Sequence, residues 1–159
     1  MKVAIVMGSK SDYPTVEKAE NVLKEFGVDF DTRIISAHRT PKIAAEFSNS
    51  AEENGYEVII AAAGKAAHLA GVLAAGTAVP VIGIPMKTSD FGGMDSLLST
   101  VQMPKGIPVA TVAVNGAENA ALLAAEMLSI KYPELREAMK AYKKKMEEDI
   151  IALDREMNQ

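Results

Sequence analysis

The chain has 159 residues, a length that suits one domain with a hydrophobic core of its own. Apolar residues make up 48% and charged residues 24% of the sequence, which is typical of a globular protein. The net charge of −4 and the lack of a basic run argue against DNA or RNA as a partner.

Cysteine is absent, which excludes disulfides, thiolate nucleophiles and cysteine-ligated zinc or iron–sulfur sites. The apolar run at the N-terminus is too short for a signal peptide. No window reaches the roughly 20 apolar residues of a membrane span. We therefore expect a soluble, cytoplasmic protein that makes no contact with a membrane.

Short apolar runs alternate along the chain with segments of helical periodicity. Asp12 suits the N-cap of the first helix, Gly27 its C-terminal stop, and Pro41 the first position of the second helix. The predicted strands cover residues 3–7, 30–36, 58–63, 81–84 and 109–114. The predicted helices cover residues 16–26, 41–53, 66–75, 95–102 and 117–128.

A long helix is predicted after Pro133, because apolar residues then recur at alternating spacings of three and four. This stripe consists of Leu135, Met139, Tyr142, Met146, Ile150 and Leu153. Strand–helix alternation with nearly continuous apolar strands predicts a parallel sheet covered on both faces. The whole chain, residues 1–159, is predicted to form one α/β domain.

The loops that follow the first three strands hold the candidate site. Ligands of an open parallel sheet bind outside the carboxyl ends of its strands. The first of these loops reads GSKSD, the second SAHRTP and the third AAGKAAH, starting at residues 8, 36 and 62. Both histidines of the protein and Arg39 lie in them. We expect the polar chemistry to gather at this one edge of the sheet.

The first loop contains neither a dinucleotide fingerprint nor a P-loop. Ser9 and Ser11, together with backbone N–H groups at a helix start, suit a phosphate oxygen, although such residues are also common in turns and caps. Asp12 would repel a phosphate. It is therefore either the helix N-cap or a partner of ribose hydroxyls, and both interpretations stay open.

The pair His38-Arg39 carries a sharper signal, since both residues lie between the end of a strand and the start of a helix. Histidine gives and takes a proton near neutral pH, and the arginine fork binds phosphate or carboxylate in two places. Their adjacency predicts proton transfer on an anionic substrate. His68 follows the next strand and is expected at the same pocket. Two histidines without nearby Asp, Glu or Cys ligands make a poor metal site.

Several blocks of sequence closely resemble the PurE family, the class I N5-carboxyaminoimidazole ribonucleotide mutases of bacterial purine biosynthesis. These blocks are GSKSD, SAHRTP, AAHLAG and MDSLLSTVQMPKGIPVATVAVN, followed by ENAALLAAEML. The resemblance runs from about residue 2 to about residue 128. It implies a flavodoxin-like three-layer sandwich, a small ribonucleotide substrate, no cofactor, and a homo-octamer with shared active sites.

The resemblance also implies a group of residues for each part of the substrate. The ribose phosphate is bound by Ser9, Ser11, Asp12 and Arg39, and Asp12 contacts the ribose hydroxyls. The imidazole ring lies beside Ser36, Ala37 and His38. The migrating carboxyl group is held by Gly64, His68 and Leu69.

The implied reaction moves a carboxyl group from an exocyclic nitrogen to ring carbon C4. A route that fits the residues loses CO2, traps it between small residues and backbone amides, and adds it back at C4. His38 removes the proton from C4 and supplies one to the nitrogen, with His68 as the second catalytic candidate.

Three positions of the third loop depart from the family pattern, which usually has Gly, Gly and Pro where this chain has Ala62, Lys65 and Ala70. Lys65 either steadies a carboxylate, as a substrate-binding residue, or points into solvent. Because neither Ala nor Lys readily reaches the backbone angles open to Gly, the loop is expected to differ in shape from the family's usual one.

Two other functions compete with the mutase. A related enzyme carboxylates aminoimidazole ribonucleotide directly with CO2, but such relatives tend to have Lys at the position of Arg39 and to lack the AAHL block. A non-catalytic nucleotide-binding or signalling module of flavodoxin-like shape is the third hypothesis. A receiver domain would need clustered acidic residues after strands one and three, and only Asp12 follows the first.

Overall fold

The structure is a computed structural model that describes residues 1–158. Within this range the chain forms a five-stranded sheet in which all neighbouring strands run parallel, in the order β2-β1-β3-β4-β5. This order is the flavodoxin-like one, and it confirms the expected fold. The strands are β1 (Lys2–Met7), β2 (Asp29–Ile34), β3 (Val58–Ala63), β4 (Val81–Pro85) and β5 (Ala110–Thr111).

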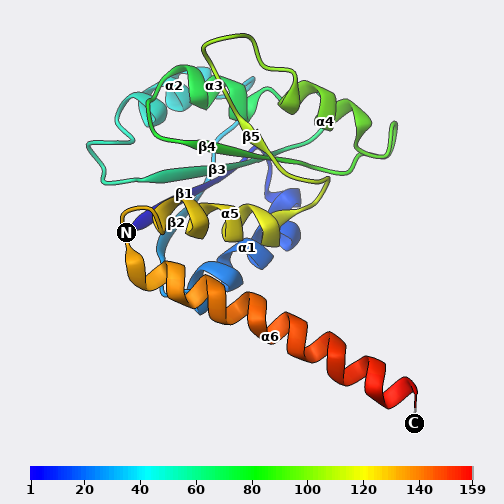
Figure 1. Ribbon diagram of the computed structural model, residues 1–159. Coiled ribbons are helices and arrows are strands. Elements are labelled where there is room, and N and C mark those ends of the chain that lie inside the picture. The colour runs from blue at the N-terminus through cyan, green and yellow to red at the C-terminus, as the bar shows by residue number, and fades with distance from the viewer. Residues whose placement is uncertain (159) are drawn as a thin grey trace.

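Helices cover both faces of the sheet and complete three layers (Figure 1). One face carries α1 (Tyr13–Glu25), α5 (Ala117–Leu128) and α6 (Pro133–Met157). The other carries α2 (Pro41–Asn49), α3 (Leu69–Ala75) and α4 (Met94–Val101). A short 3₁₀ turn, η1 (Lys10–Asp12), precedes α1.

The central strands are apolar at every position because each of their two faces meets a layer of helices. In β1, Val3 and Ile5 join the core beneath α1 and α5, whereas Ala4 and Val6 join the core beneath α2 and α3. All four side chains are fully buried. Side chains alternate between the faces of a strand, so a strand covered on both sides shows no polar alternation.

The two edge strands are shorter than the sequence predicts. β2 ends at Ile34 rather than at residue 36, because Met7, the last residue of β1, pairs with Ile34 and offers no partner beyond it. β5 covers two residues instead of residues 109–114, and it pairs with β4 only at Ala110 and Thr111. An edge strand has one neighbour, so its length is set by that neighbour as much as by its own apolar run.

Two helices also differ from their predicted bounds. α2 ends at Asn49, where the Ser50 hydroxyl bonds the Glu46 carbonyl and competes with a further helical turn. α3 begins at Leu69 rather than at residue 66, because the chain still turns at residues 66–68, where the His68 N–H donates to the Ala66 carbonyl at 2.9 Å. The residues just before α3 therefore belong to the loop that lines the site.

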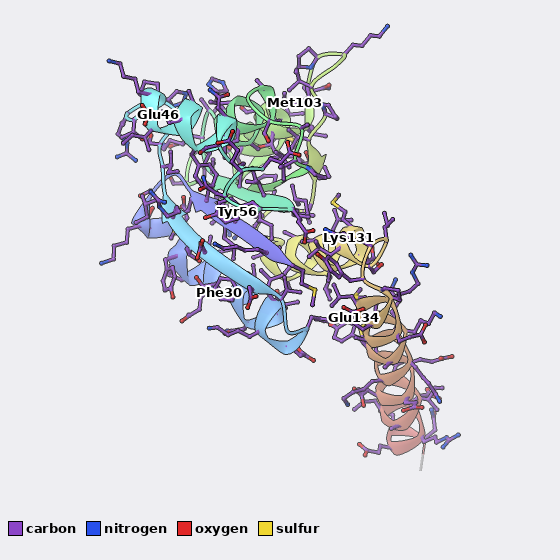
Figure 2. All side chains as sticks on the ribbon, turned by 90° about the vertical axis from the view of Figure 1, so that its left-hand side faces the viewer. Phe30, Glu46, Tyr56, Met103, Lys131 and Glu134 are labelled. Carbon is purple, nitrogen blue, oxygen red and sulfur yellow. The ribbon has the colours of Figure 1, made fainter. Side chains whose placement is uncertain are left out.

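The last helix, α6, leaves the body of the molecule after Lys131 and extends away from the sheet (Figures 1 and 2). Its 25 residues make a rod of about 37 Å. Leu135 and Met139 are buried, and the Tyr142 ring packs edge-on against Phe26 with 5.6 Å between centroids. Ile150 and the rest of the predicted stripe beyond Tyr142 are exposed.

Across residues 1–158, none of the helices combines the length and the apolar character needed to cross a lipid bilayer.

Candidate active site

A cavity of about 530 Å³ opens at the carboxyl ends of the strands, where the sequence places the site. Its walls come from the loops after β1, β2, β3 and β4. Every residue predicted for catalysis or substrate binding lines it: Ser9, Ser11, Asp12, Ser36, Ala37, His38, Arg39, Gly64, Lys65, His68 and Leu69. The sheet topology thus brings together three loops that are far apart in the sequence.

Hydroxyl groups organise the loop after β1. The Ser9 side chain caps η1 by accepting the Ser11 backbone N–H at 3.3 Å and the Ser11 hydroxyl at 2.9 Å. Asp12 occupies the N-cap position of α1, but its side chain makes no capping hydrogen bond. The predicted N-cap position of Asp12 is therefore confirmed, although the side chain that caps the turn before α1 is that of Ser9.

Asp12 is a half-buried carboxyl group without a cationic partner in the part of the chain that the structure describes. Burial raises its pKa above the ordinary value of 3.8, against the opposing hydrogen bonds from Ser11 and the Ser9 backbone. The fold keeps this carboxyl group at the cavity although burial disfavours its charge.

Arg39 ties the second loop to the first. Its guanidinium donates to the Gly8 carbonyl at 2.8 Å and to the Ser36 hydroxyl at 3.3 Å, and its backbone N–H donates to the same hydroxyl at 3.2 Å. Thr40 closes the turn, because its hydroxyl accepts the Ser36 N–H and donates to the Ser36 carbonyl. The guanidinium is thus held at the cavity wall by two neutral oxygens. Because these partners carry no charge, the positive charge of the guanidinium is available to bind an anionic group of a ligand.

The two histidines meet across the cavity. His38 Nε2 lies 2.8 Å from His68 Nδ1, and the rings stand nearly perpendicular, at 84°, with 5.0 Å between centroids. At this distance one ring donates a proton and the other accepts it. Both side chains are exposed toward the cavity. The sequence predicts their proximity, and the structure adds that they are joined by a hydrogen bond.

Lys65 lines the cavity with a side chain that is 70% exposed, and its predicted contact with the substrate stays a prediction. Its ammonium group pairs with the Asp90 carboxylate, in the loop after β4. The mutual hydrogen bond raises the pKa of Lys65 and lowers that of Asp90. The backbone of Lys65 is left-handed, an arrangement that costs a residue other than glycine about 1–3 kcal/mol. Lys65 thus adopts a left-handed backbone angle that glycine reaches more readily.

The fourth wall of the cavity is absent from the sequence-based prediction. It consists of Met86, Lys87, Thr88 and Ser89, directly after β4. The rule that selected the first three loops applies equally to this strand, and it would have found these residues.

Buried hydroxyl groups of α4 and Asn115 position this fourth loop. Ser96 is fully buried and donates to the Met86 carbonyl at 2.6 Å. The Thr88 hydroxyl donates to Asp95 at 2.7 Å, and the Asn115 side chain accepts the Lys87 N–H at 2.8 Å. The sequence block that contains Asp95 and Ser96 therefore supports the cavity from outside it.

Within residues 1–158, no three side chains of His, Asp or Glu are gathered as a metal ion would require. The sequence expectation that the protein needs no cofactor stays a prediction.

A sequence model of the AIR carboxylase family matches residues 2–149. The chain belongs to this family. N5-carboxyaminoimidazole ribonucleotide mutase of Pyrococcus abyssi is 60% identical over 145 residues, which cover 91% of this chain and 83% of the relative. The mutases of Thermotoga maritima and Saccharolobus solfataricus are 54% and 51% identical, over 94% and 95% of this chain and 88% and 96% of their own lengths.

A solved structure is similar to this chain over nearly its whole length. The crystal structure of Treponema denticola PurE superposes with a TM-score of 0.91 at 31% identity and covers 99% of both chains. These similarities agree with the PurE resemblance of the sequence blocks.

Proposed function

We propose that this protein is an N5-carboxyaminoimidazole ribonucleotide mutase that converts its substrate to 4-carboxy-5-aminoimidazole ribonucleotide. The name is that of the relatives at 51–60% identity. The observation that carries the proposal is the hydrogen bond between His38 and His68 inside the cavity. A mutase must remove one proton and deliver another during each turnover, and this pair of imidazoles provides groups that do so at neutral pH.

The phosphate of the substrate is proposed to bind between the first and second loops. The Arg39 guanidinium lies there, 2.8 Å from the Gly8 carbonyl, beside the hydroxyls of Ser9 and Ser11. The ribose hydroxyls then donate to Asp12, whose carboxylate the α1 cap does not use. The cation and the carboxylate thus serve different parts of one ligand, which removes the phosphate–carboxylate repulsion.

The carboxyl transfer is proposed to pass through CO2. The bond between the exocyclic nitrogen and the carboxyl carbon breaks, the nitrogen takes up a proton, and CO2 is released into the cavity. Carbon C4 of the ring then bonds to CO2 and gives up its proton, so protons balance over the turnover. His38 is the group that moves this proton, and the hydrogen bond to His68 fixes the orientation of its ring.

Direct carboxylation of aminoimidazole ribonucleotide is the second candidate, favoured by the name of the matching family. Two observations favour the mutase. Position 39 holds Arg rather than the Lys expected of the carboxylases, and the AAHL block is present and places His68 in the cavity.

The test is to supply the purified protein with N5-carboxyaminoimidazole ribonucleotide, and separately with aminoimidazole ribonucleotide plus bicarbonate. We expect fast formation of the C4 carboxylate only from the first substrate, measured by its ultraviolet absorbance. Efficient turnover of only the second pair would assign the protein as a carboxylase instead.

We also propose that the protein is a cytoplasmic homo-octamer with shared active sites. In the isolated chain, apolar side chains on and beside α4 are exposed, among them Phe91, Met94 and Leu98. Contiguous apolar surface of this kind usually marks an interaction site. Size-exclusion chromatography with light scattering measures the assembly, and a stable monomer would contradict it.

A further inference from the structure

Two charged side chains join neighbouring walls of the cavity. Lys65, in the loop after β3, pairs through its ammonium group with Asp90, in the loop after β4. The two strands are adjacent, with Ala63 opposite Pro85. Lys65 lines the cavity, and Asp90 lies one residue beyond the lining residue Ser89. The pair therefore forms a bridge across the rim of the cavity.

The segment that contains Asp90, residues 89–92, is held at its two ends. At one end the Thr88 hydroxyl donates to Asp95 at 2.7 Å. At the other end the Ser96 hydroxyl donates to the Gly93 carbonyl at 3.0 Å. The residues between these anchors are exposed. A backbone hydrogen bond from Gly92 to the Thr88 carbonyl closes the segment into a turn, and the Lys65 ammonium contacts this turn from the third loop.

Fold stability does not explain this bridge. The side chains of Lys65 and Asp90 are 70% and 54% exposed, and ion pairs this exposed add little to stability. The left-handed backbone of Lys65 is unfavourable for any residue except glycine. A strained residue that gains only a weak ion pair points to a functional reason for its position.

The bridge lies on the side of the cavity where the mobile carboxyl group is expected. Gly64, which by resemblance holds that group, precedes Lys65 directly. A Cβ atom on Gly64 would lie 3.5 Å from Met86 and 3.6 Å from Thr88, so the third and fourth loops are in contact beneath the bridge. CO2 has no charge for a side chain to hold, and confinement is the available means of keeping it near C4.

We propose that the Lys65–Asp90 bridge closes this rim and retains CO2 between its release from nitrogen and its addition to C4. Lys65 is then a positioning residue, whose ammonium group holds Asp90 and the segment 89–92 rather than the substrate. The inference rests on the proposed mutase function. Without the bridge, CO2 leaves before C4 reacts, and each escape yields aminoimidazole ribonucleotide in place of the carboxylated product.

The test follows the carboxyl carbon. The protein receives N5-carboxyaminoimidazole ribonucleotide labelled with ¹³C in its carboxyl group, in unlabelled bicarbonate buffer with carbonic anhydrase, and loss without enzyme is subtracted. Mass spectrometry measures the label retained in the product and the aminoimidazole ribonucleotide formed. For Asp90→Ala we expect at least threefold more aminoimidazole ribonucleotide per turnover than for the natural protein, with total substrate consumption changed less than twofold.

Matched variants separate the bridge from a general effect on the loop. Asp90→Glu and Lys65→Arg keep the ion pair and are expected to retain the label, whereas Lys65→Asn, which tolerates the same backbone angle without a charge, is expected to lose it as Asp90→Ala does. Added salt weakens an exposed ion pair. It should therefore raise the loss of label in the natural protein and leave Asp90→Ala unchanged. Thermal unfolding checks that each variant is folded.

If Asp90→Ala retains as much label as the natural protein, the proposed role of the Lys65–Asp90 bridge in retaining CO2 is wrong. An Asp90→Ala variant that behaves normally beside a Lys65→Asn variant with a raised KM would instead show that Lys65 contacts the substrate directly. Failure of the natural protein to convert N5-carboxyaminoimidazole ribonucleotide at all would refute the proposed function, and it is seen before any variant is tested.

Discussion

His38 and His68 approach each other because their loops follow β2 and β3, which flank β1 in the sheet. Their meeting is predictable from the sequence, since the carboxyl-edge rule needs only the strands and their direction. The 2.8 Å hydrogen bond between the rings is not predictable in this way. It depends on the conformation of the loop after β2, which the hydroxyls of Ser36 and Thr40 fix through hydrogen bonds to backbone groups three and four residues away.

Replacing His38 by Asn tests its role as the proton carrier. Asn keeps a polar group near His68 but cannot move a proton at neutral pH, so we expect kcat to fall by roughly 1,000-fold. Nucleotide binding, measured by calorimetry with the reaction product, should change less than threefold, because the phosphate and ribose contacts are assigned to other residues. A variant with full kcat would remove His38 from the mechanism.

Asp12 predicts a pH-dependent difference in stability. Its native pKa is raised by burial, so the native state binds this proton more tightly than the unfolded chain does. As the pH rises from the ordinary value of 3.8 through the raised pKa, ionisation therefore removes native-state stability. Asp12→Asn avoids that loss.

We expect Asp12→Asn to have a higher free energy of unfolding than the natural protein at pH 7, with a difference that closes as the pH approaches 4. Urea unfolding of both proteins at several pH values measures it. The same variant should bind the substrate more weakly. A stability difference that does not vary with pH would contradict the assigned shift.

At the scale of elements, the block MDSLLST shows what sequence patterns leave out. Its apolar spacing predicts the helix α4, and its resemblance to a family marks it as important. Neither shows that the Ser96 hydroxyl donates a hydrogen bond to the carbonyl of the cavity residue Met86, 10 residues earlier in the chain. Such a contact depends on how closely α4 approaches β4, and that approach is permitted by a glycine in the strand.

Gly83 is that glycine, and it supports the site from below. A Cβ atom there would lie 2.4 Å from the Thr100 Cγ2 of α4, closer than side chains pack. We expect Gly83→Ala to lower the free energy of unfolding by about 2 kcal/mol, as overpacked core substitutions do. Urea unfolding measures the change, and kcat/KM should fall with it because α4 positions the fourth loop.

Gly8→Ala is the matched control for stability, because the nearest heavy atom to its Cβ would be the Ala62 carbonyl oxygen at 3.9 Å. The expected cost of Gly8→Ala is within about 0.5 kcal/mol. Equal destabilisation by the two variants would contradict the packing argument.

At the scale of the whole molecule, the apolar stripe of α6 is longer than the body it packs on. Leu135 and Met139 are buried, whereas Met146, Ile150 and Leu153 are 45%, 66% and 56% exposed. The sequence predicts both the helix and its stripe. It does not predict at which residue of α6 the stripe stops being buried by the rest of the chain. The apolar periodicity is the same whether the stripe packs on its own chain or on another copy.

Ile150→Lys tests whether another copy covers the end of α6. In a monomer an exposed substitution changes stability by less than about 0.5 kcal/mol. In the proposed octamer the lysine would be buried at an interface, so we expect dissociation to smaller species in light scattering. Ala152→Lys is the control, since it lies about 200° around the helix from Ile150. An unchanged assembly in both variants would exclude this face from the interface.

The strand order has one more consequence, for the floor of the cavity. Two strand spacings, about 10 Å, separate β2 from β3, and the histidine loops close that gap above the end of β1. Gly8, the residue directly after β1, lines the cavity there and has ordinary backbone angles. A bulky side chain at this position would occupy the ligand's space without straining the backbone. The floor therefore offers a way to block the site while leaving both histidines in place.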